Sequence, residues 1–201
     1  MPLRDHFRPP VSERHSWDEL HGGWPMKIVE SLFLVLPCDF VSAPLIRLGG
    51  SSEPFDEYEV RVYDVTRGRR LVAANELVSP SNKDRPDTRQ AFIAKCASLM
   101  QQDISVTIVD VVTTRDFNLY AELLRFLGQN ESAPTDQPTN IYAATCRGTR
   151  PRKRWILENW YQPLAIGKPL PTLPLWLTND LAVSLNLESS YQETCRVLRM
   201  G

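Results

Sequence analysis

The 201-residue sequence has few of the residues that build metal-rich or disulfide-bonded proteins. Its four cysteines stand singly, with no C-x-x-C spacing, and its three histidines follow no metal-ligand spacing. A zinc site or a disulfide framework is therefore not expected, and single cysteines favour a reducing, cytoplasmic compartment. The N-terminal segment lacks the apolar stretch of a signal peptide, and the longest hydrophobic run, 32–36, is too short for a membrane span, so we expect no membrane partner.

Neither positive nor negative charge is in excess. The formal net charge is −1, with 42% hydrophobic and 23% charged residues, so no global field recruits nucleic acid and any contact with it would depend on local patches. The sequence contains no P-loop, no G-x-G-x-x-G and no nucleophile elbow, which argues against the common nucleotide-binding and serine-hydrolase sites.

The pattern of the chain predicts one domain over residues 1–201. Its core spans about 16–128, a polar linker follows at 129–140, and 141–201 form a C-terminal β-hairpin, a proline-rich extended arm and a helix. The arm, 163–174, could pack on its own core or on a neighbouring subunit, so a homo-oligomer stays open. Ser16 with Glu19 predicts a short capped turn that Gly22 and Gly23 interrupt.

The order of the core elements predicts an α/β (α+β) fold with a central mixed sheet flanked by helices. Alternation of hydrophobic and polar residues predicts a β-hairpin, and apolar residues at helical spacing predict helices in segments that follow the hairpin. The expected elements are a helix over 26–36, strands over 40–48, 57–64 and 71–78, a helix over 88–102, a strand over 106–112, a helix over 118–127, a hairpin of 141–146 with 155–161, and a helix over 187–200.

The most informative position is Glu76, in a predicted strand that ends at Pro80. Val72, Glu76 and Val78 have the same parity and share one face of the strand. A carboxylate beside two valines is costly to bury unless a cation, a metal or hydrogen-bond donors receive it. The position therefore indicates either a metal or phosphate site at a strand end, or a half-buried glutamate paired with an arginine.

These segments carry a resemblance to a known family. The stretch Glu76-Leu77-Val78-Ser79-Pro80-Ser81-Asn82-Lys83, the helix that contains Lys95, and Val106–Asp110 resemble the core of Uma-type restriction-endonuclease-like proteins of the PD-(D/E)XK nuclease superfamily. The chain is also similar to the bacterial domain-of-unknown-function family 4058, including Trp17 to Leu36 and the proline-rich 163–175. The resemblance implies a restriction-endonuclease-like three-layer core.

It also implies a metal-dependent chemistry. Two carboxylates at neighbouring strand ends would hold Mg²⁺, and a nearby lysine would stabilise charge at phosphorus. The resemblance gives one carboxylate role to Glu76, with Val78 standing where the lysine usually follows. Lys95 is the natural replacement, and Lys83, with Asn82 before it, is the alternative.

The second of the two metal-binding carboxylates is less well defined by the sequence. Asp64, at the end of the first hairpin strand, is our candidate for the second metal ligand, provided that the hairpin register places it on the face of Glu76. A two-residue loop at Arg67-Gly68 would instead set Glu59 opposite Glu76. The loop before the hairpin offers Glu53 and Asp56.

Two further features could contribute. Asp110, at the end of a buried strand, is a candidate third ligand or the cap of the following turn. The basic loop that contains Arg150, Arg152, Lys153 and Arg154 could contact a phosphate backbone, or it could be a solvated hairpin tip. The resemblance thus implies a Mg²⁺-dependent endonuclease acting on DNA or RNA, or a catalytically decayed relative that binds nucleic acid or protein.

Overall fold

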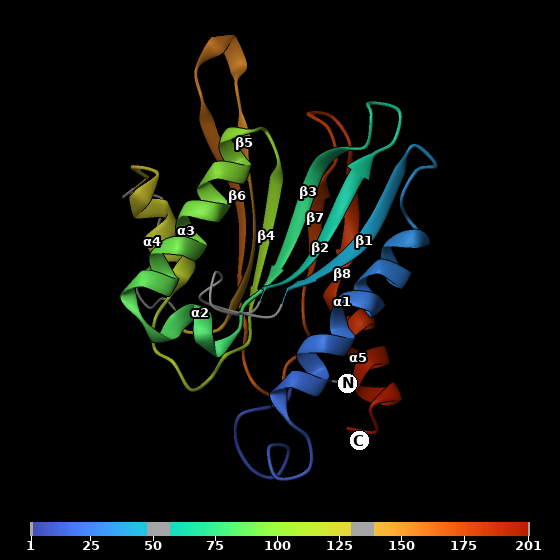
Figure 1. Ribbon diagram of the computed structural model, residues 1–201, viewed down its shortest axis with the longest axis vertical. Helices are drawn as coiled ribbons and strands as arrows, with labels where there is room; N and C mark the ends of the chain where they lie inside the picture. Colours follow the sequence, from blue (N-terminus) through green and yellow to red (C-terminus); the bar gives the residue numbers. More distant parts are fainter. Residues whose placement is uncertain (1, 48–56, 130–138, 201) are drawn as a thin grey trace.

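A six-stranded sheet runs through the middle of the computed structural model, which describes residues 2–47, 57–129 and 139–200 (Figure 1). The strands lie in the sheet in their order along the chain. Neighbours are antiparallel except β3 and β4, which are parallel. The strands are β1 (Phe40–Arg47), β2 (Glu57–Asp64), β3 (Arg70–Leu77), β4 (Ser105–Asp110), β5 (Tyr142–Thr149) and β6 (Ile156–Pro163). The predicted α/β class with mixed strand directions is confirmed.

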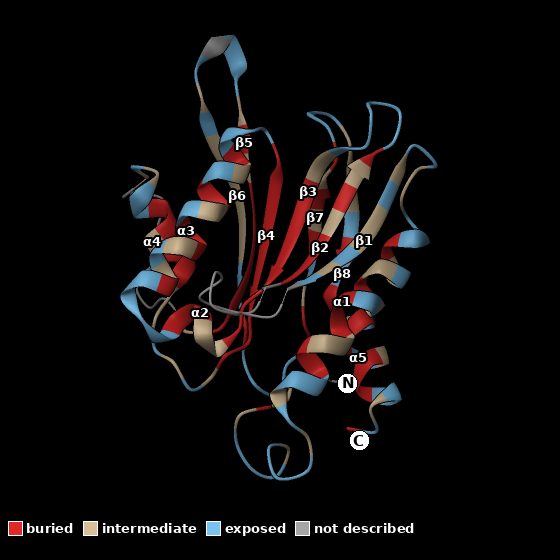
Figure 2. Ribbon diagram, in the orientation of Figure 1, coloured by how far each residue is buried: buried red, intermediate tan, exposed pale blue. Residues whose placement is uncertain are grey.

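Helices cover both faces of this sheet, and buried residues line both (Figures 1 and 2). Helices α1 (Trp17–Phe33) and α5 (Leu187–Val197) pack on one face together with a two-stranded sheet of β7 (Thr172–Trp176) and β8 (Ala182–Asn186). The other face is covered by α3 (Pro86–Gln101) and α4 (Leu119–Phe126). Across the described ranges, no helix combines the length and the apolar character needed to span a bilayer.

Strand β2 separates the two faces by simple alternation. Its even-numbered residues Tyr58, Val60 and Val62 are buried in the core beneath α1. Side chains alternate along a strand, so the odd-numbered positions Glu59 and Arg61 point to the face covered by α3. The pattern that predicted the strand therefore also sends charged groups to the second face.

The parallel pair β3–β4 requires a crossover, which the short helix α2 (Pro80–Asp84) and α3 provide. The buried stripe of α3 includes Phe92, Cys96 and Met100 and packs on the sheet. Lys95 borders this stripe, so its side chain can reach the strands beneath. The crossover thus delivers a lysine to the sheet face that carries Glu59.

One local prediction, at the N-terminus, was wrong. The N-terminal helix does not restart at residue 26, because α1 runs unbroken through Gly22, Gly23 and Pro25. Its buried residues Leu20, Trp24, Ile28 and Leu32 recur every four residues, and this packing outweighs the weak local propensity.

The proline-rich arm ends in the extended strand β7, in agreement with the prediction, but its partner strand β8 was not predicted. Residues 130–138 of the predicted linker lie outside the described residues, as do the candidate acids Glu53 and Asp56.

Candidate functional site

Glu59 and Glu76 face each other across the β2–β3 pair. The register sets Glu59 opposite Glu76, and Asp64 opposite Arg70 at the far end of the two strands. Glu59 is fully buried, and Glu76 is 2% exposed. Two carboxylates directly opposite each other repel, so this arrangement requires compensating cations.

Lys95 supplies one of these cations from α3. Its Nζ lies 2.8 Å from Glu59 Oε2 and 2.9 Å from Glu76 Oε2. The two oxygens therefore lie within the range, about 4–6 Å, over which charged groups set one another's ionisation. Arg61 adds a second cation, because its Nε donates to Glu59 Oε1. We refer to Glu59, Arg61, Glu76 and Lys95 as the carboxylate cluster.

Burial and charge act in opposite directions on this cluster. Burial by itself raises the pKa of Glu59, but the hydrogen bonds and charges of Arg61 and Lys95 outweigh it, and the pKa lies below its usual value. Burial also disfavours the charged form of Lys95 and so lowers its pKa. The neighbouring carboxylates of Glu76 and Glu59 outweigh this effect, and the pKa of Lys95 lies well above its usual value. Lys95 is therefore a permanent cation at neutral pH and cannot act as a general base.

Asp64 does not belong to this site. The alternation of β2 places it on the face opposite to Glu59, at the other end of the strand. Its carboxylate accepts from the backbone and hydroxyl of Thr66, at 2.9 and 2.7 Å, and these bonds hold its pKa below the usual value. The expectation that Asp64 joins Glu76 is thus corrected: the acid opposite Glu76 is Glu59.

The cause of this difference is a bulge in the hairpin. Between Glu59 and Val62 the pairing has the register of a two-residue loop, and it shifts at Val62/Tyr63 before the turn. A bulge cannot be derived from alternation alone, which is why the sequence left both registers open. The signal that favoured Glu59 was its odd-numbered parity, shared with Arg61 and opposite to the apolar face.

Asn82 and Lys83 hold the start of the crossover. Asn82 Oδ1 accepts from the backbone N–H of Ser79 at 2.8 Å, which caps α2. Lys83 Nζ donates to Asp110 Oδ2 at 2.9 Å and to the Asn140 carbonyl at 3.1 Å. Neither residue contacts the carboxylate cluster in these bonds. These bonds give both residues structural roles at the turn after Pro80, and the catalytic roles that the resemblance implies for them stay predictions.

The Lys83–Asp110 pair is a second buried ion pair, with both side chains fully buried. Burial raises the pKa of Asp110 to about 6, although the charge of Lys83 acts in the opposite direction. Asp110 Oδ1 also accepts from the backbone N–H of Val112 at 3.0 Å. The prediction that Asp110 caps the turn is confirmed by this bond.

The basic loop lies at the other end of the sheet from Glu76. Arg150 donates to Asp103 at 2.8 Å and to the Gln101 carbonyl at 3.1 Å, so it ties the β5–β6 tip to the end of α3. Arg152 and Arg154 are exposed. Lys153 lies in the 3₁₀ turn Pro151–Lys153, and its side chain is outside the described residues.

The residues of the carboxylate cluster fit a divalent hard cation in part. Mg²⁺ is bound in proteins through one or two carboxylates together with water and substrate phosphates. Glu59 and Glu76 supply two carboxylates directed at one point, and that point is the Nζ of Lys95. Within the described residues, no group of three or more acidic, histidine or cysteine side chains could hold a metal.

Comparisons with protein-family models, with characterised proteins and with solved structures found no match to this chain.

Proposed function

We propose that this chain is a metal-dependent phosphodiesterase that acts on nucleic acid, with Glu59, Glu76 and Lys95 as its functional residues. The observation that carries the proposal is the meeting of two buried carboxylates from adjacent strands with one lysine from the crossover helix. The order of a helix, three antiparallel strands, a crossover helix and a parallel fourth strand also supports a restriction-endonuclease-like core.

Each residue has a defined role in this proposal. Glu59 and Glu76 would hold Mg²⁺, which when bound lowers the pKa of a water molecule and neutralises the scissile phosphate. Lys95 remains protonated, so it would donate to the phosphate and stabilise the charge that develops on it. Arg61 would hold Glu59 in place through its hydrogen bond.

Solvent reaches the carboxylate cluster mainly through its two cations. The side chain of Lys95 is 18% exposed and that of Arg61 is 23% exposed, whereas the carboxylates are buried. A phosphate that approached this opening would meet the positive groups first, as an anionic substrate requires. The metal would lie behind them, so it must compete with the ammonium of Lys95 for the same oxygens.

This competition gives a direct test. Mg²⁺ and Mn²⁺ are titrated by calorimetry into the wild type, Glu76→Gln, Glu59→Gln and Lys95→Met. We expect saturable binding by the wild type, its loss in both glutamine variants, and tighter binding by Lys95→Met. Cleavage of labelled single- and double-stranded DNA and RNA should require all three residues. Asp64→Asn, a matched change on the opposite face, should leave metal binding intact.

The competing function is a non-catalytic module that binds nucleic acid or protein. A specific observation favours it: two carboxylates and two cations already balance each other in the carboxylate cluster without any metal. If millimolar Mg²⁺ and Mn²⁺ bind neither the wild type nor Lys95→Met, the phosphodiesterase proposal is wrong and the cluster is an internal ion network.

A further inference from the structure

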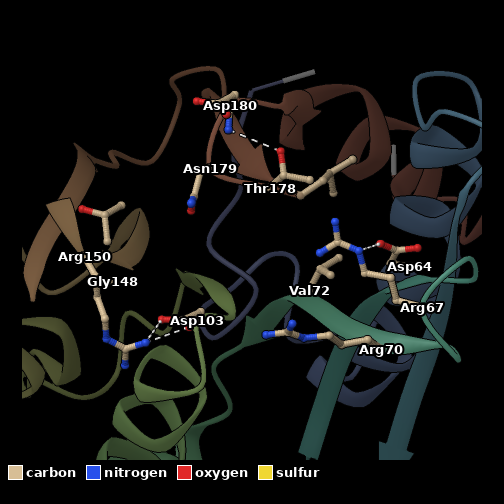
Figure 3. Close-up of a pocket in the computed structure, with 12 residues that line it drawn as sticks. Asp64, Arg67, Arg70, Val72, Asp103, Gly148, Arg150, Thr178, Asn179 and Asp180 are labelled. Carbon is tan, nitrogen blue, oxygen red and sulfur yellow. Dashed lines mark hydrogen bonds and ion pairs between the residues drawn. The ribbon is translucent and has the colours of Figure 1, made fainter. Parts of the chain in front are cut away.

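A polar groove opens at the end of the sheet opposite to Glu76, where three turns meet (Figure 3). Its volume is about 500 Å³, within the range of ligand sites in proteins. The β2–β3 turn contributes Arg67 and Arg70, the β5–β6 turn contributes Gly148 and Arg150, and the β7–β8 turn contributes Asn179. We call this feature the arginine groove.

The walls of the groove are fixed by side-chain contacts. Arg147 stacks on Trp176, with its guanidinium carbon 3.4 Å from the ring centre, and donates to the Asn179 carbonyl at 2.9 Å. Arg147 also pairs with Glu158 at 2.6 Å, which anchors the β7–β8 turn on the sheet. The groove is therefore preformed, and a ligand would bind without ordering its walls first.

The arginines of the groove differ in how their charge is met. Arg67 lies 3.4 Å from Asp64, and Arg150 lies 2.8 Å from Asp103. Arg70 makes no ion pair or side-chain hydrogen bond with any residue of the described ranges, and its side chain extends into the groove (Figure 3). Arg70 is thus the guanidinium of the groove that is available to an anion, between two others that neighbouring acids hold in place. Asp180 also lines the groove, so the excess positive charge comes from the arginines of the flanking tips.

Backbone strain marks the same region. Arg69, at the β2–β3 tip, has φ of 58°, Arg152, at the β5–β6 tip, has φ of 52°, and Asp103 beside the groove has φ of 62°. A non-glycine residue in this left-handed conformation costs about 1–2 kcal/mol. Glycine or asparagine would relieve that cost. Arg69 is compensated in part by its contact with the ring of Tyr63, 4.8 Å from the guanidinium carbon, whereas Arg152 has no ion pair or ring contact within the described residues, which favours a use for its charge.

The spacing of the two tips defines the class of ligand. Strand β4 lies between the two hairpins, so adjacent-strand distances of roughly 4.8 Å place the tips about 10–20 Å apart. One phosphate group cannot contact both tips. A polyanion with repeated phosphates can, and the major groove of duplex DNA, about 12 Å wide, has the same dimension.

We propose that the arginine groove and its two flanking tips bind the phosphate backbone of nucleic acid. The choice of nucleic acid as partner rests on the function proposed above, but the surface is separate from the carboxylate cluster. Glu59 and Asp64 are five residues apart on β2, roughly 16 Å, and their side chains lie on opposite faces of the sheet, so the groove and the carboxylate cluster are two distinct surfaces. Contacts of this kind position the ligand and carry no base specificity.

The test uses fluorescence anisotropy of labelled single-stranded and duplex DNA and RNA, in EDTA, at several salt concentrations. The test variant combines Arg69→Gly, Arg70→Gln and Arg152→Gly, which remove three charges and relieve the strained backbone. The control combines Arg8→Gln, Arg14→Gln and Arg199→Gly. It removes the same charge elsewhere on the chain, and Arg199 has φ of 55°. Thermal melts of both variants check folding.

We expect the wild type and the control to bind alike and the test variant to bind at least tenfold more weakly while melting no earlier. Its salt dependence, d log K/d log[salt], should flatten by up to about 2.7, from three lost phosphate contacts on a duplex. Equal binding by test variant and control, no saturable wild-type binding, or preference for phosphatidylserine vesicles over nucleic acid would each overturn the inference. EDTA keeps metal binding and cleavage out of the assay, so this outcome is independent of the proposed catalysis.

Discussion

Replacing Lys95 by methionine removes the cation that two buried carboxylates share. Methionine keeps most of the length and packing of the lysine stem but makes no hydrogen bond to Glu59 or Glu76. Removing one partner of a buried ion pair costs about 3–5 kcal/mol, because the remaining charge stays desolvated. A lysine that only extended from the helix surface would account for about 0–1 kcal/mol. The two roles of Lys95 therefore predict clearly different stabilities.

The loss should depend on pH in a defined way. The pKa of Glu59 is depressed in the folded state, so its contribution is present above the unfolded value, about 4.3, and is lost as the pH falls through the folded pKa. The pKa of Lys95 is raised, so its contribution is complete below the unfolded value, about 10.4, and is lost at higher pH. This network should give the wild type a plateau between about pH 5 and 10.

Lys95→Met changes this profile. Without the ammonium, the facing carboxylates should share a proton, so the variant should recover part of its stability as the pH falls from 8 to 5. Urea unfolding at pH 8, 6.5 and 5, with Lys27→Met as the surface control, measures the difference. A loss of less than 1 kcal/mol at pH 8, or a loss that does not narrow toward pH 5, would refute the reasoning.

Three further predictions concern other buried groups. Lys83→Met should destabilise the fold by about 3–5 kcal/mol in urea unfolding, because it strands the buried Asp110. His6 is 3% exposed, and burial lowers its pKa to about 4. Between about pH 6.5 and 4 the unfolded chain therefore binds more protons than the folded chain, and stability falls as the pH is lowered. The stability advantage of the wild type over His6→Gln should therefore shrink from pH 7 to 5, and an unchanged difference would contradict this account. Gly148→Ala would place its Cβ against the indole nitrogen of Trp155 and should cost about 1–3 kcal/mol in thermal unfolding, whereas the control Gly22→Ala, with open space in α1, should be neutral or stabilising.

The local sequence predicts those elements whose pattern and packing agree. Strand β2 alternates cleanly, and its predicted bounds, 57–64, match the structure. Helix α1 shows the opposite case: Gly22, Gly23 and Pro25 argue against a helix, while the buried stripe of Trp24 and Ile28 requires one. Such a stripe gains its energy from α5 and the sheet, which a window of local sequence does not contain.

The carboxylate cluster shows the same limit at a finer scale. Parity placed Glu76 beside valines and required a cation, a metal or hydrogen-bond donors for it. Lys95 was expected as a catalytic lysine, and an arginine was the alternative partner of Glu76. The identity of the second carboxylate depends on the hairpin register, and the bulge at Val62/Tyr63 reconciles a five-residue connection with the pairing of Glu59 and Glu76. A bulge reflects tertiary packing and strand twist, so Asp64 and Glu59 could not be separated from the sequence.

Because its charges balance internally, the carboxylate cluster could serve as an internal ion network or as a ligand-binding site. Replacement of its charged residues by neutral ones bears on the first of these roles. A triple variant with Glu59→Gln, Glu76→Gln and Lys95→Met keeps one charge of the cluster, that of Arg61, which is partly exposed. If the cluster serves stability alone, no buried charge in this variant is left without a partner. Such a triple variant should then be as stable as Lys95→Met or more so. A chain under selection for stability alone has little reason to retain three buried ionic groups that neutral residues can replace. Their presence at the junction of two strands and a crossover helix is what the proposed ligand, which would compete with Lys95 for the carboxylates, would require.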